Sequence, residues 1–205
     1  MKTVAVIDYD MGNLHSVCKG LEFAGVEPIV TDQAKDILDA AAVVLPGVGA
    51  FDPAMAHLHR RNLGELLPQV IAQGKPFLGI CLGLQILFEK SEEGQAPGLG
   101  IFAGTVNRFQ AEPDLTIPHM GWNQLHLSQP QLPLWQGLEP EPWLYFVHSF
   151  YVAPREPTLT AATVTHGQQT VTAAIAQNNV MAVQFHPEKS ATTGLKILKN
   201  FVSLF

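Results

Sequence analysis

The first ninety residues alternate short apolar runs with segments of helical periodicity, and this alternation limits the possible folds more than any other feature of the chain. The apolar runs are TVAVID (3–8), VEPIV (26–30), AAVVLPG (41–47) and KPFLGI (75–80). Helices are expected from Asn13, a candidate cap, to about Gly25, and around residues 33–40 and 53–73. Apolar strands separated by helices are typical of a parallel sheet with covered faces. We therefore predict an α/β fold with a doubly wound, mostly parallel sheet and helices on both faces.

From about residue 98 the pattern changes to β-rich segments interrupted by proline and glycine, which predicts an antiparallel or mixed extension of the sheet. The last part of the chain again shows an apolar strand followed by a helix. NVMAVQFH (179–186) is a predicted strand, and 191–205 a terminal helix with Leu195, Leu198, Phe201 and Val202 on one face. Because no repeat or linker interrupts the 205 residues, we expect a single domain over 1–205.

The composition excludes several classes of protein. Hydrophobic residues make up 47% of the chain and charged residues 15%, so wholesale disorder is excluded. The net charge of -6 comes without a Lys/Arg run, which argues against nucleic acid as a partner. The first apolar run reaches Asp8 too soon for a signal peptide or a membrane span, so we expect a cytoplasmic protein without a membrane partner. In that compartment Cys18 and Cys81 should both be free thiols.

The strongest local signal is Gly79-Ile80-Cys81-Leu82-Gly83, a G-x-C-x-G between a predicted strand and a helical pattern of Leu82, Gln85, Ile86, Phe88 and Glu89. It has the form of a nucleophile elbow, in which glycines allow a sharp turn and close packing around the nucleophile. The positive end of the helix dipole would favour the thiolate. A lone cysteine is more often a small core residue, but both flanking glycines favour a nucleophile here.

A thiol nucleophile needs a base, and His186 is the best candidate among eight histidines. It closes an apolar strand and is followed by Pro187 and Glu188, whose carboxylate could fold back on the imidazole. H-P-E alone is weak evidence, since a histidine after a strand is more often structural. Together with Cys81 it predicts a Cys-His-Glu triad. Neither cysteine lies in a metal-ligand pair, and the carboxylates lack metal-loop spacing, so we expect no metal and no cofactor.

PGVGAF (46–51), GICLGLQILFE (79–89) and FHPEKS (185–190) together resemble the class I (triad) glutamine amidotransferases, in the right order over essentially the whole chain. The resemblance implies Cys81 as nucleophile, His186 as general base and acid, and Glu188 as its orienter. It implies that the N–H groups of Val48 and Leu82 form the oxyanion hole. In this family the loop peptide has to reorient before it can donate, so the resemblance also implies low activity for the isolated chain. The residues it implies for holding glutamine are Gly49, Gln85, Ser149 and Phe150, the last standing where the family often has tyrosine.

Three further segments narrow the resemblance. YDMGNLHSV (9–17), PHMGWN (118–123) and YFVHSF (145–150) look like the glutaminase subunits of imidazole glycerol phosphate synthases, enzymes of histidine biosynthesis. That likeness implies a heterodimer with a (βα)₈-barrel cyclase, which would receive the ammonia and make imidazole glycerol phosphate and AICAR. Lys189 would form a salt bridge across the interface. Trp122 could either contact the cyclase or pack in the core of this chain, and the sequence leaves both alternatives open. The expected interface residues are Met11, Asn13, Met120, Trp122, Asn123 and Lys189.

Two other functions remain open from the sequence. One is a glutaminase subunit for another synthase, such as that of anthranilate or carbamoyl phosphate. Leu84 argues against it, because those proteins usually have histidine in the corresponding C-x-G-H-Q, and they lack an M-G-W-N segment. The other is a catalytically silent binding protein of the same fold, since a fold alone does not determine chemistry.

Overall fold

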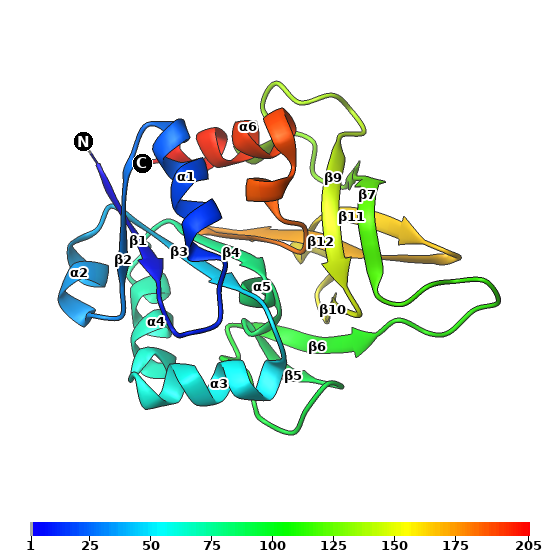
Figure 1. Ribbon diagram of the computed structural model, residues 1–205, viewed down its shortest axis with the longest axis horizontal. Helices are drawn as coiled ribbons and strands as arrows, with labels where there is room; N and C mark the ends of the chain where they lie inside the picture. The colour runs from blue at the N-terminus through cyan, green and yellow to red at the C-terminus, as the bar shows by residue number, and fades with distance from the viewer. Residues whose placement is uncertain (1) are drawn as a thin grey trace.

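The computed structural model describes residues 2–205, and its centre is a sheet whose first half is parallel (Figure 1). The order across the main sheet is β2-β1-β3-β4-β13-β12-β10-β6-β5, and the first five strands in this order pair in parallel. Their carboxyl ends therefore meet at one edge, where open α/β sheets place their sites. The parallel strands are β1 (Thr3–Ile7), β2 (Glu27–Thr31), β3 (Ala42–Gly47), β4 (Phe77–Cys81) and β13 (Val180–Val183).

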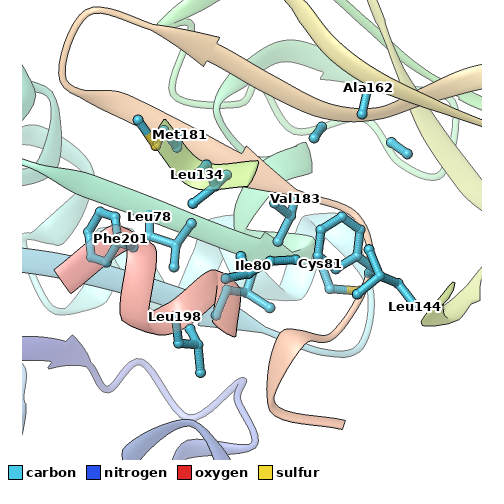
Figure 2. Close-up of a cluster of buried hydrophobic side chains, with 14 of the residues drawn as sticks. Leu78, Ile80, Cys81, Leu134, Leu144, Ala162, Met181, Val183, Leu198 and Phe201 are labelled. Carbon is cyan, nitrogen blue, oxygen red and sulfur yellow. The ribbon is translucent and has the colours of Figure 1, made fainter. Parts of the chain in front are cut away.

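Helices cover both faces of this parallel half. On one face α1 (Leu14–Ala24) packs beside α6 (Ala191–Val202), and both contribute to a buried apolar cluster with β4. Figure 2 shows Leu198 and Phe201 of α6 in this cluster with Leu78 and Ile80 of β4, and Cys81 at the end of the strand. On the other face a second cluster buries side chains of the remaining long helices. These are α2 (Ala34–Asp39), α3 (Phe51–Arg60) and α4 (Leu63–Ala72).

The second half of the sheet is mainly antiparallel, as its β-rich sequence predicted. β12 continues the sheet from β13 and is followed by β10 and β6. β11 branches from β12 and pairs in turn with β8, while β5 pairs β6 in parallel. The bounds of these strands are β5 (Phe88–Ser91), β6 (Phe102–Arg108), β8 (His126–Leu127), β10 (Phe150–Pro154), β11 (Thr160–His166) and β12 (Gln169–Gln177). Short 3₁₀ turns are η1 (Pro133–Trp135), η2 (Pro157–Leu159) and η3 (Pro187–Lys189).

A separate two-stranded antiparallel sheet, which we call the β7–β9 ribbon, consists of β7 (His119–Gln124) and β9 (Trp143–His148). Its side chains alternate between two faces, as in any strand. His119 and His148 form one register pair and are buried, whereas Met120 and Trp122 on β7 are exposed. The ribbon therefore has an inner face packed on the protein and an outer face open to solvent.

Four local expectations were wrong. The segment 53–73 forms two helices, because Asn62 takes left-handed angles (φ 58°) between α3 and α4. The helix after Cys81, α5 (Leu82–Gln85), ends early, and Phe88 instead begins β5. β2 is an exposed edge strand rather than a covered one. Asn13 does precede α1, but its side chain makes no capping hydrogen bond.

None of the helices described in residues 2–205 combines the length and apolar character needed to cross a membrane.

Candidate active site

The turn at Cys81 has the strained geometry of a nucleophile elbow. Cys81 ends β4 with φ 55° and ψ -110°, a conformation that non-glycine residues rarely adopt, and α5 starts at the next residue. A Cβ atom at Gly79 would lie 2.8 Å from the carbonyl oxygen of Gly83, and one at Gly83 would overlap the carbonyl oxygen of Leu45. Both glycines are therefore required by close backbone contacts, and the turn is locked in place by the neighbouring strand.

His186 follows β13, the strand beside β4, and so reaches the same edge of the sheet as Cys81. Its Nδ1 atom lies 2.8 Å from Glu188 Oε1, and the two side chains are only 2% and 1% exposed. Burial by itself lowers the pKa of His186, but Cys81 and Glu188 outweigh it and raise this pKa to about 9. Among residues 2–205 the buried Nε2 atom has no hydrogen-bond partner, and the raised pKa favours its taking up the proton of the Cys81 thiol.

Cys81 and His186 both line one pocket of about 300 Å³. Its volume and its mixture of polar and apolar groups suit a small amino acid. The oxyanion and substrate residues predicted from the sequence all contribute to its wall, and Glu93, Pro118, Val147 and His148 complete it. Those predicted residues are Val48, Gly49, Leu82, Gln85, Ser149 and Phe150.

The two predicted oxyanion donors differ in their present hydrogen bonding. Leu82 is the first residue of α5, where a helix leaves N–H groups without internal partners. The Val48 N–H, in contrast, donates to the carbonyl oxygen of Met11 at 2.8 Å. In this conformation it is not available to a substrate. Rotation of the peptide between Gly47 and Val48 would be needed to release it.

Gln85 is 5% exposed and connects the pocket wall to the core. Its Nε2 atom donates to the carbonyl oxygen of Phe150 at 3.1 Å and to Gln184 Oε1 at 3.1 Å. Gln184 in turn donates to Cys81 Sγ at 3.6 Å. Gln184 was not predicted from the sequence, because a glutamine within an apolar strand has no local signature. Glu93 was not predicted either, because it lies in a polar loop.

A second group of histidines lies under the β7–β9 ribbon. His119 Nδ1 is 2.9 Å from His148 Nε2, and His148 Nδ1 donates to the Phe150 carbonyl oxygen at 2.8 Å. Burial lowers the pKa of His119 to about 4 and that of His148 to about 3, so both are neutral near pH 7. Asn123 Nδ2 donates to the carbonyl oxygen of Thr165 at 2.8 Å and lies 3.0 Å from His119 Nε2. Of these side chains His148 lines the pocket, His119 contacts His148, and Asn123 contacts His119.

The predicted interface residues do not all face outward. Met120 is 64% and Trp122 49% exposed, so Trp122 is not a core residue. Lys189 is exposed and takes part in none of the ion pairs found among residues 2–205. Met11 and Asn13 are half-buried, and the Met11 carbonyl oxygen accepts from the Val48 N–H. Asn123, however, has its side chain turned inward on His119.

This combination of a doubly wound sheet, a cysteine elbow and a buried His-Glu pair agrees with the family comparison. Residues 5–204 match the family model described as glutamine amidotransferase class-I. The chain therefore belongs to the class-I glutamine amidotransferase family.

More specific relatives are subunits of one synthase. The chain is 71% identical to the imidazole glycerol phosphate synthase subunit HisH of Cyanothece sp. (strain PCC 7425 / ATCC 29141), covering 99% of this chain and 96% of that protein. It is 67% identical to the HisH subunit of Acaryochloris marina (strain MBIC 11017), covering 98% and 94%. Within the amidotransferases, the chain thus falls in the family of HisH subunits.

Solved structures agree on the fold. A structure of PurLQS from Thermotoga maritima superposes with a TM-score of 0.77 at 20% identity, covering 99% of this chain and 98% of that chain. The predicted fold class, a mostly parallel doubly wound sheet with an antiparallel extension, is confirmed.

Proposed function

We propose that this chain is the glutaminase subunit of an imidazole glycerol phosphate synthase, with Cys81, His186 and Glu188 as its catalytic triad. The observation that carries the proposal is the meeting of a strained cysteine and a carboxylate-bound imidazole at one pocket. The HisH relatives supply the pathway: histidine biosynthesis. We place the reaction in the cytoplasm, because both Cys18 and Cys81 are free and a reducing compartment preserves thiols.

The reaction begins with proton transfer from Cys81 Sγ to His186 Nε2, and Glu188 stabilises the resulting imidazolium. The thiolate then attacks the side-chain carbonyl carbon of glutamine. His186 returns the proton to the leaving nitrogen, so ammonia departs and a glutamyl thioester remains on Cys81. Water, deprotonated by the same imidazole, hydrolyses the thioester and releases glutamate.

Two backbone N–H groups would stabilise the tetrahedral oxyanion, those of Leu82 and Val48. The Leu82 group is in place at the start of α5, whereas the Val48 group must first leave the Met11 carbonyl oxygen. The isolated chain therefore has an incomplete oxyanion hole. Low glutaminase activity without the partner follows from this, and docking would complete the hole by rotating the loop peptide.

Glutamine would lie between the oxyanion loop and the segment after β9. Ser149 and Phe150 present backbone groups to its amino acid end, while Gly49 and Gln85 border the side chain. Glu93 adds a carboxylate to the pocket, which suits the positively charged α-amino group.

The partner is a (βα)₈-barrel cyclase that receives the ammonia and forms imidazole glycerol phosphate and AICAR. We propose that it docks on the outer face of the β7–β9 ribbon, because Met120 and Trp122 expose large apolar side chains beside the pocket. Met11, Asn13 and Lys189 are the further residues proposed to contact the cyclase, and the inward-facing Asn123 would support the ribbon rather than touch the partner.

Replacement of the nucleophile tests the reaction. Cys81→Ala should abolish glutamine-dependent synthesis by the complex while leaving synthesis from added ammonium salt intact, since the cyclase needs only ammonia. Cys18→Ser is the matched control and should leave both activities unchanged. Glutamate release that persists in Cys81→Ala would refute the assignment of the nucleophile.

A further inference from the structure

Gln184 touches the reacting sulfur, although the triad mechanism gives it no role. It lies one residue beyond β13, and its Nε2 atom donates to Cys81 Sγ at 3.6 Å. The side chain is completely buried, at 0% exposure, where an amide is costly unless it is hydrogen-bonded. Both ends of the amide are in fact bonded, because Gln184 Oε1 accepts from Gln85.

The orientation of the Gln184 amide is fixed by an acceptor that cannot be reversed. The main-chain carbonyl oxygen of Phe150 can only accept, so the group of Gln85 that faces it must be the NH₂ group. The same NH₂ group faces Gln184, which must therefore present its oxygen there. Its own NH₂ group is left to face Cys81 Sγ. If the Gln184 amide were inverted, its NH₂ group would face the NH₂ group of Gln85, and its oxygen would face Sγ of Cys81.

We propose that Gln184 is a further catalytic residue, whose side-chain N–H stabilises the Cys81 thiolate by a direct hydrogen bond. This rests on the proposed role of Cys81 as nucleophile. The proton leaves Sγ for His186 Nε2, the negative charge stays on sulfur, and the Gln184 donor meets that charge. A hydrogen bond to a charged group is about twice as strong as a neutral one, so the contact favours the ionised thiol. When the thioester forms, the charge disappears and the advantage is lost.

Other ionisable groups also act on this sulfur, and they set the background for a test. His186, with Glu188 behind it, lies on the side of η3. Tyr9 reaches the elbow from beyond β1, and burial followed by the charge of Cys81 raises the pKa of its hydroxyl. Because these groups remain in a Gln184 variant, a change in thiolate formation can be assigned to the lost amide donor.

The test measures alkylation of Cys81 by iodoacetamide as a function of pH, in a Cys18→Ser background with a single thiol. Gln184→Met keeps the volume and removes the donor. We expect its alkylation rate near pH 7 to fall about tenfold, as for loss of a charge-assisted hydrogen bond, and to approach the parent rate at high pH, where the thiolate forms in both proteins. An equal loss at every pH would indicate blocked access instead and would overturn the proposal.

Gln184→Glu separates chemistry from substrate binding. One carboxylate oxygen can still accept from Gln85, so the pocket wall is retained, but the other oxygen replaces the donor and opposes the thiolate. In the complex with the cyclase we expect kcat for glutamine to fall at least tenfold with KM changed less than about twofold. An unchanged kcat would contradict the proposal.

A control variant guards against general destabilisation. Asn200→Leu also removes a buried amide, one that donates to the carbonyl oxygens of Leu134 and Gln136 at 2.9 Å, away from the pocket. It should leave the pH dependence of alkylation at Cys81 unchanged. Alkylation reports on the sulfur alone. Persistent glutamine hydrolysis in Cys81→Ala would therefore defeat the proposed function without altering this result.

Discussion

The turn at Cys81 and the loop at Val48, which would carry the nucleophile and an oxyanion donor under the proposed function, stand side by side at the ends of β4 and β3, yet they are built in opposite ways. Cys81 and Leu82 are 7% and 2% exposed and are held by glycines pressed against the neighbouring strand. Val48 is 39% exposed, and its N–H is bonded to another loop. The difference teaches that one half of the site is fixed by the core, while the other half is exposed, where under the proposed function a partner would reset it.

The fixed half is tested most strongly by adding one methyl group. Gly83→Ala places a Cβ against the carbonyl oxygen of Leu45, a backbone atom that cannot move without shifting β3. We expect a loss of about 3 kcal/mol or more in the free energy of unfolding, measured by urea denaturation. Gly64→Ala in α4 is the control, because the atom it meets belongs to the side chain of exposed His59, and its effect should stay within about 1 kcal/mol. Similar stabilities for the two variants would show that the elbow is not locked.

Docking of the partner that would reset the adjustable half is tested at the outer face of the β7–β9 ribbon. Trp122→Ala should weaken cyclase binding by about 2 kcal/mol, roughly a 30-fold rise in Kd, as expected for a buried aromatic residue at an interface. Titration calorimetry with the cyclase measures it. Leu38→Ala, on α2 at the far edge of the sheet, removes a comparably exposed apolar side chain (44%) and should leave Kd unchanged. Equal Kd values for Trp122→Ala and the parent would show that the interface lies elsewhere on the molecule.

The smallest effect concerns the contribution of the His186–Glu188 pair to stability. Cys81 and Glu188, against the opposing effect of burial, raise the pKa of His186 from 6.5 to about 9. A pKa that is raised in the folded state stabilises the folded protein. This stabilisation is complete below about pH 6.5 and is lost as the pH rises through 9. Glu188→Gln removes one of the two partners. Its deficit in unfolding free energy should therefore be about 1 kcal/mol at pH 6 and shrink by pH 9.5.

Urea denaturation at the two pH values measures this deficit. Glu27→Gln, on the exposed edge strand β2, makes the same chemical change without a buried imidazole beside it. Its difference from the parent should not depend on pH over this range. A Glu188→Gln deficit that grows with pH would contradict the assignment of the raised pKa.

Much of the fixed half was predictable because its signals are local. G-x-C-x-G places glycines where the backbone makes contact, and H-P-E places a carboxylate two residues from its imidazole, so short spacing determines both geometries. The strand order then joins them, since β4 and β13 are parallel neighbours. The family resemblance added the oxyanion and substrate residues, which no spacing in the sequence could bring to one pocket.

What could not be predicted depends on contacts between distant segments. Gln184 acquires its partners across the sheet, and nothing near it in the sequence indicates them. Phe88 fits a helical period but pairs with Phe102 in β5 and β6, because tertiary pairing outweighs local periodicity. Asn62 breaks the helical segment through its own left-handed angles, which asparagine tolerates better than most residues.

Under the proposed mechanism, the hydrogen bond from the Val48 N–H to the Met11 carbonyl oxygen controls the rate of the reaction. A backbone hydrogen bond contributes about 1 kcal/mol net, whereas an oxyanion donor is worth roughly 3 kcal/mol in the transition state. Under the proposed mechanism, exchanging the first for the second gains about 2 kcal/mol and raises the rate about thirtyfold. Under the proposed function, the isolated subunit would consume little glutamine until the cyclase docks.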